Sequence, residues 1–114
     1  MGTSDLSNLK IKEASDLLRA GELVAFPTET VYGLGADATN DSAVAKIFEI
    51  KGRPQFNPLI SHLPSAHHAF EFGVFSTIAK ELASTFWPGP ITFVVPRSNK
   101  CPISWLASAG LETV

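Results

Sequence analysis

The alternation of helical and extended hydrophobic patterns constrains the fold of this chain most strongly. Apolar residues recur at helical spacing over about 9–20, an uninterrupted apolar run follows at 23–26, and helical spacing returns at 44–51. Such a chain buries the apolar stripes of its helices against a sheet. The pattern contains no internal repeat and no low-complexity segment. The sequence therefore predicts a mixed α/β (α+β) fold, with a twisted sheet and flanking helices.

Capping residues and helix breakers set the expected limits of the helices. The first helix is predicted over about 9–20, and Gly21 follows where a left-handed residue would end it. The second helix begins at a cap among residues 39–42 and ends at Lys51. Ser65 and Ser76 are the expected N-caps of a short helix and a longer one.

Short apolar runs are predicted to be strands, and the first of them has the composition of a strand buried on both faces. Pro27 is expected to end that strand, and Gly110 precedes residues that begin another. A short helix is expected over 103–109. The predicted strands lie at 23–26, 58–63, 91–95 and from 111 onward.

Residues 27–38 are too rich in glycine and hydroxyl groups for a regular element, and too apolar for a plain surface loop. They are predicted to form a structured loop that lines a pocket. Gly33 and Gly35 would let a ligand approach backbone N–H groups closely. This G-x-G lacks the third glycine of the dinucleotide-binding fingerprint, so a Rossmann fold receives little weight.

Residues 51–62 set two cations, an amide and an imidazole around two prolines: Lys51, Arg53, Asn57 and His62. Such a cluster at a helix-to-strand junction predicts an anion-binding site. Two other interpretations remain open. The segment could be a solvated basic turn, or the cations could simply complement the dipole at the end of the preceding helix.

Length and composition indicate one domain over residues 1–114. No apolar run is long enough to span a bilayer and no leader is recognised, so a cytoplasmic location is the default expectation. The lone Cys101 has no partner for an internal disulfide or a cysteine-based metal site. The net charge is −2, but cations outnumber acids from Lys51 onward. This local field favours a small phosphate-bearing ligand over a nucleic-acid duplex.

Three separated segments resemble the YrdC-like threonylcarbamoyl-AMP synthase family. They are Ala-Phe-Pro-Thr-Glu-Thr-Val-Tyr-Gly-Leu-Gly at 25–35, the Lys-Gly-Arg-Pro, Asn-Pro-Leu-Ile and His of 51–62, and Trp-Pro-Gly-Pro-Ile-Thr-Phe-Val at 87–94. Their order and spacing across most of the chain argue against chance similarity. The resemblance implies a YrdC-like fold.

The resemblance also implies a nucleotidyltransferase activity. L-threonine, bicarbonate and ATP, with Mg²⁺ entering alongside ATP, would give threonylcarbamoyl-AMP and pyrophosphate. That product is the activated donor for modifying the adenosine beside certain tRNA anticodons. Negative charge gathers near both reacting groups as the threonine carbamate attacks the α-phosphate, so cations are expected at the site.

The same resemblance implies roles for individual residues. Lys51 and Arg53 match the first half of the family's split K-x-R and S-x-N signature and are implied to be catalytic and nucleotide-binding. Asn57 is implied to be nucleotide-binding as well. No residue is implied to be a metal ligand. The residues implied to bind the substrate are Thr28, Tyr32 and His62.

Each of these substrate-binding assignments has a structural alternative. Thr28 could cap the end of its strand, Tyr32 could belong to the core, and His62 could be a hydrogen-bonded structural histidine. His67 and His68 are adjacent on a predicted helix and therefore point in different directions, which argues against a shared metal site.

The chain ends at Val114, before the family's usual basic strand and its Ser-x-Asn segment. The sequence therefore predicts a single partial YrdC-like domain, truncated at its C-terminus, that lacks half of the site. A sheet without its later strands leaves an unpaired edge, which favours self-association.

The alternative function is a non-catalytic RNA-binding or regulatory module that contacts tRNA or double-stranded RNA. Protein partners from the tRNA modification pathway are expected in either case. The acidic net charge and the lack of alternating aromatic and basic residues predict weak, salt-sensitive RNA binding. A sugar-phosphate lyase of related fold is disfavoured because no acidic metal-binding cluster is found.

Overall fold

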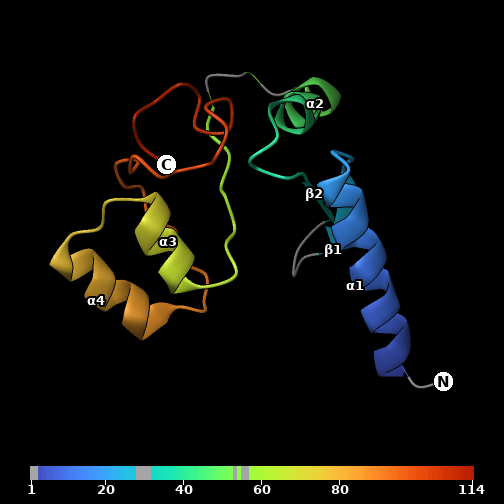
Figure 1. Ribbon diagram of the computed structural model, residues 1–114, viewed down its shortest axis with the longest axis horizontal. Helices are drawn as coiled ribbons and strands as arrows, with labels where there is room; N and C mark the ends of the chain where they lie inside the picture. Colours follow the sequence, from blue (N-terminus) through green and yellow to red (C-terminus); the bar gives the residue numbers. More distant parts are fainter. Residues whose placement is uncertain (1–2, 28–31, 53, 55–56) are drawn as a thin grey trace. The chain divides into compact units, whose positions relative to one another are not determined.

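The computed structural model describes residues 3–27, 32–52, 54 and 57–114. Over these ranges the fold is α+β, with four helices and one small antiparallel sheet (Figure 1). Contacts divide the chain into an N-terminal unit, residues 1–54, and a C-terminal unit, residues 55–114. The predicted fold class is confirmed, and the single domain stays a prediction. None of the described helices is both long enough and apolar enough to cross a membrane.

The N-terminal unit contains a hairpin that contacts a long helix. The hairpin is antiparallel and pairs Val24 with Gly35. A Cβ atom on Gly35 would lie 2.8 Å from the ring of Phe26, so the Phe26 ring packs across the space that this glycine leaves. The elements of the unit are α1 (Thr3–Arg19), β1 (Val24–Pro27), β2 (Tyr32–Gly35) and α2 (Asp41–Lys51).

Three sequence predictions need correction in this unit. α1 begins at Thr3 and not near residue 9, because the apolar pattern starts later than the helix, and a helix extends cheaply into polar residues once nucleated. β1 is not buried on both faces, since Phe26 is 43% exposed; within the described ranges its sheet contains one other strand, β2. Part of the predicted loop, Tyr32–Gly35, is a strand, and its first residue lies opposite Pro27. Pro27 is the last residue of β1, in agreement with its predicted position at the end of that strand.

The limits of α2 follow from its caps, as the sequence predicts. The side chain of Asn40 accepts a hydrogen bond from the backbone N–H of Ala43 at 3.1 Å. Gly52 ends the helix in the left-handed region, at φ 61°, and its N–H bonds back to the last turn. One face of the helix forms the core of this unit and consists of Ala43, Val44, Ile47 and Phe48.

The C-terminal unit holds two helices in contact with each other, α3 (Ala66–Phe72) and α4 (Thr77–Phe86) (Figure 1). Both predicted N-caps are confirmed. The Ser65 hydroxyl accepts from the N–H of His68, and the Ser76 hydroxyl accepts from the N–H of Ala79 at 3.1 Å. These bonds satisfy N–H groups that a helix start leaves without a partner.

An aromatic cluster packs around the end of α4. The Trp87 ring lies 5.0 Å from the Phe93 ring and 6.2 Å from the Phe75 ring, in edge-to-face geometry. Phe75 also meets Phe70 of α3 at 5.0 Å. The indole N–H of Trp87 donates to the carbonyl of Ile91 at 2.9 Å. Because edge-to-face pairs add to the burial of the rings, this cluster holds α3, α4 and the following segment together.

Short backbone pairings replace three predicted strands in this unit. Residues 95–98 are flanked on one side by 72–74 and on the other by 112–114, through isolated antiparallel bridges. Val95 and Val114 exchange both hydrogen bonds, at 3.0 and 2.8 Å. Residues 58–63 and 91–95 are not strands, because apolar runs become strands only where a neighbouring segment offers a continuous ladder.

Residues 103–109 form a series of turns and not the predicted short helix. Two consecutive residues, Ala109 and Gly110, have φ angles of 55° and 72°, which no helix accommodates. The hydroxyl of Ser104 also accepts from the N–H of Leu106 at 3.2 Å. Such local bonds offer the backbone an alternative to helical pairing.

Candidate functional site

Lys51 stands on the last turn of α2 with an exposed side chain. The four buried residues of α2 fix the helix, so the position of Lys51 is set by the core of the N-terminal unit. A cation here also faces the negative end of the helix dipole. Lys51 can therefore complement the helix dipole when no ligand is bound and still bind an anion. Its side chain is exposed, so the ammonium group can turn from the helix end to a phosphate.

Asn57 and His62 lie in an irregular segment of the C-terminal unit. Asn57 is half-buried and the His62 side chain is exposed. Between them, the backbone N–H of Leu59 donates to the carbonyl of Ala107 at 2.8 Å. This bond ties the 57–62 segment to the turns at 103–109.

The remaining predicted site residues fall partly outside the described residues. Thr28 and Arg53 lie outside them, and Tyr32 is described only as the first residue of β2, opposite Pro27. Tyr32 and Lys51 belong to the N-terminal unit, whereas Asn57 and His62 belong to the C-terminal unit. Their meeting in one pocket stays a prediction.

Arg97 contacts several of the turns that are bonded to the 57–62 segment, a role that its sequence context does not indicate. Arg97 donates from Nη1 to the hydroxyl of Ser108 at 3.0 Å and from Nη2 to the carbonyl of Ile103. Its guanidinium carbon lies 4.0 Å from the centre of the Trp105 ring. No sequence signal could have identified this cluster, because its contacts join residues 6 to 11 positions apart through irregular turns.

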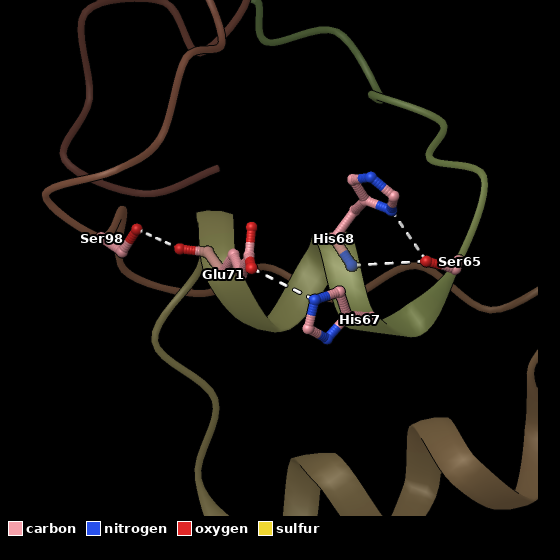
Figure 2. Close-up of polar contacts among 5 residues, drawn as sticks. All are labelled: Ser65, His67, His68, Glu71 and Ser98. Carbon is pink, nitrogen blue, oxygen red and sulfur yellow. Dashed lines mark hydrogen bonds and ion pairs between the residues drawn. The ribbon is translucent and has the colours of Figure 1, made fainter.

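The two histidines of α3 are engaged with their own helix (Figure 2). His67 Nε2 lies 3.2 Å from a carboxylate oxygen of Glu71, and the two side chains are largely exposed. His68 Nδ1 lies 2.8 Å from the Ser65 hydroxyl. Figure 2 shows the His67 ring beside Glu71 and the His68 ring beside Ser65, and the centres of the two rings lie 6.1 Å apart in edge-to-face geometry. Within the described part of the chain, no group of three or more histidine, cysteine or acidic side chains could hold a metal ion.

A comparison with protein-family models matches residues 16–114 to the family Sua5_yciO_yrdC, described as telomere recombination. The match begins inside α1 and includes both units. It therefore covers all of the predicted site residues.

Curated relatives carry the same name in an archaeon and a bacterium. The chain is 49% identical over 112 residues to a threonylcarbamoyl-AMP synthase of Pyrococcus abyssi, covering 92% of this chain and 31% of that protein. It is 49% identical over 106 residues to a threonylcarbamoyl-AMP synthase of Bacillus subtilis, covering 92% of this chain and 30% of that protein. The chain thus spans about a third of the length of these relatives.

A solved structure agrees with these relatives. The crystal structure of Pyrococcus abyssi Sua5 complexed with L-threonine matches with a TM-score of 0.85 and 48% sequence identity. The match covers 93% of this chain and 31% of that one. The fold of the chain is therefore the fold of the corresponding part of that structure.

Proposed function

Because this chain belongs to the Sua5/YciO/YrdC family, we propose that it carries the first part of a threonylcarbamoyl-AMP synthase. The observation that supports this most directly is 49% identity to a named synthase over 92% of the chain. The proposed reaction converts L-threonine, bicarbonate and ATP into threonylcarbamoyl-AMP, pyrophosphate and water.

The proposed chemistry has two steps. The amine of threonine and bicarbonate first form a carbamate and release water. A carbamate oxygen then bonds to the α-phosphorus of ATP, the bond from that phosphorus to the oxygen bridging to the β-phosphate breaks, and pyrophosphate leaves. The nucleophile and the leaving group are both anionic, so positive charge close to the α-phosphate lowers the barrier.

Lys51 and Arg53 are proposed to supply this positive charge. The guanidinium of Arg53 would bind two oxygens of a phosphate or carboxylate at once, whereas Lys51 would act as a mobile point charge at the end of α2. The exposed position of Lys51 supports this role, because its ammonium group is accessible to a ligand.

Other residues are proposed to hold the substrates. Thr28, Tyr32 and His62 would contact threonine, and Asn57 would contact the nucleotide. The threonine part of the proposal is supported by the match to a relative solved with L-threonine. ATP is proposed to enter as its Mg²⁺ complex, because Mg²⁺ is commonly held by substrate phosphates together with few protein ligands.

The proposed product would serve tRNA modification. Contacts with tRNA or double-stranded RNA, protein partners of that pathway, self-association through a sheet edge and a cytoplasmic location belong to the proposal.

Selective stabilisation by L-threonine tests the substrate assignment. A ligand that binds the folded state raises its stability, by about 1.4 kcal/mol at a concentration tenfold above Kd. For a chain of this size that corresponds to a rise of roughly 5–10 °C in the midpoint of thermal unfolding. The measurement is a thermal scan with increasing L-threonine.

D-threonine is the matched control, because it has the same groups in the opposite arrangement. We expect it to leave the midpoint unchanged. An equal rise with both enantiomers would indicate a nonspecific solute effect, and no rise with L-threonine would contradict the assignment.

A further inference from the structure

The guanidinium of Arg97 is held on three sides by the turns at 103–109. Ser108 and the carbonyl of Ile103 accept its hydrogen bonds, and the Trp105 ring lies against its plane. Ser108 is only 2% exposed, and its hydroxyl lies 3.4 Å from the carbonyl of Trp105, so it can donate while accepting from Arg97. The guanidinium thus connects the beginning, middle and end of these turns.

The backbone of Arg97 is held by two neighbouring segments. Its N–H donates to the carbonyl of Glu112 at 2.7 Å, and Gly73 forms a bridge with it on the opposite side. Arg97 therefore extends from the bridged segment at 95–98 into turns whose own backbone bonds are short-range, such as that from the N–H of Ala107 to the carbonyl of Ser104 at 3.0 Å. The charge has no carboxylate within ion-pair distance among the described residues, so its interactions are with these turns.

The turns at 103–109 are in turn bonded to the 57–62 segment. Ala107 is buried, as are Ile103 and Ser108, and its carbonyl accepts the hydrogen bond from the N–H of Leu59. Leu59 lies midway between Asn57 and His62. Arg97 is thereby linked to the segment that carries both residues through two hydrogen bonds and the peptide that joins Ala107 to Ser108.

We propose that Arg97 is a positioning residue, which keeps Asn57 and His62 in place by ordering the turns that accept the Leu59 N–H. This role rests on the proposed function, since Asn57 and His62 matter only if the segment binds substrate. Arg97 itself makes no contact with the reacting groups in this account.

The geometry requires arginine and not merely a positive charge. A planar guanidinium can donate to two acceptors and stack on an indole at the same time. An ammonium group offers neither the fork nor the flat surface. Trp105, at 55% exposure, supplies stacking that another aromatic ring could replace.

Hydrogen exchange of single amides tests the linkage without relying on activity. In Arg97→Lys we expect the Leu59 amide to exchange about tenfold faster or more, because hydrogen bonds from charged groups are among the stronger ones. The Trp87 amide, which donates to Ala83 at 2.8 Å in the same unit, should change by less than about twofold. Ser108→Ala should accelerate Leu59 in the same way, which provides a second variant if the first does not fold.

Substitutions at two further positions test whether stacking on Trp105, or positive charge alone, protects the Leu59 amide. Trp105→Ala should accelerate the Leu59 amide, and Trp105→Phe should restore most of the protection. Lys100→Gln removes a nearby exposed positive charge whose side chain makes no polar contact among the described residues. It should leave Leu59 as in the unmodified chain.

The kinetic readout is the division of the effect between KM and kcat. Displacing Asn57 and His62 should raise KM for ATP and L-threonine about tenfold, while kcat stays within about threefold. Unchanged Leu59 exchange in a folded Arg97→Lys chain would overturn the proposal, as would equal acceleration of Leu59 and Trp87. If the unmodified chain forms no product, the exchange data still decide whether Arg97 holds the segment, and only the proposed function fails.

Discussion

Replacing Arg53 by lysine is expected to lower kcat/KM for threonylcarbamoyl-AMP formation about a hundredfold, since loss of one preorganised donor to developing charge typically costs that much. Arg53 lies outside the described residues, so the expectation comes from the sequence motif and from the chemistry of the guanidinium. Lysine keeps the charge but loses the bidentate geometry that binds two oxygens together. The measurement is the initial rate of product formation at subsaturating ATP.

Arg19→Lys provides the matched control. Arg19 lies at the end of α1, and its largely exposed side chain is 3.6 Å from Asp16. Exposed pairs of this kind contribute little, so the control should retain normal activity. If Arg53→Lys turned over as fast as Arg19→Lys, Arg53 would have no part in binding phosphate or carboxylate oxygens.

Replacing Phe48 by alanine is expected to lower the free energy of unfolding by about 3–5 kcal/mol. Phe48 is 3% exposed and lies on the buried face of α2. Losing its ring removes apolar contacts and leaves a cavity in the core of the N-terminal unit. Since the net stability of a small domain is about 5–15 kcal/mol, this loss is a large fraction of it. Chemical denaturation followed by circular dichroism measures the change.

Ile50→Ala tests whether the effect comes from burial. Ile50 lies two residues further along the same helix and is 67% exposed. Its replacement should change the free energy of unfolding by less than about 0.5 kcal/mol. Equal losses from both variants would mean that the buried face of α2 is not the core of this unit.

Three of the helices, α2, α3 and α4, could be predicted well because their signals are local. Ser65 and Ser76 cap the helices they were expected to cap, and α2 ends at Lys51 with Gly52 in the left-handed region. A capping hydroxyl or a left-handed glycine acts within about one turn of the helix. Such residues therefore mark the end of a helix regardless of how the rest of the chain folds.

The strands could not be predicted equally well because strand formation depends on a partner. Residues 58–63 have the composition of a strand but do not form one, although the N–H of Leu59 donates to the carbonyl of Ala107. Residues 91–95 do not form a strand either, and Val95 exchanges hydrogen bonds with Val114. An apolar run shows that a segment prefers burial, but it does not show whether a second segment lies alongside it.

The candidate site divides in the same way. Lys51, Asn57 and His62 are predicted from motifs, whereas the residues proposed to hold the 57–62 segment are not. Arg97, Trp105 and Ser108 meet only because irregular turns bring them together. Contacts of this kind follow no periodic sequence pattern, so they could not be predicted from the sequence.

Formation of threonylcarbamoyl-AMP from labelled bicarbonate tests the central claim most directly. The chain would be incubated with MgATP, L-threonine and ¹³C-bicarbonate, each omitted in turn, and the products analysed by mass spectrometry. The longer synthase of Pyrococcus abyssi provides the positive control. We expect a labelled adenylate that requires all three substrates. Its absence, from a chain shown to be folded by circular dichroism while the control forms product, would contradict the claim that this chain carries the activity.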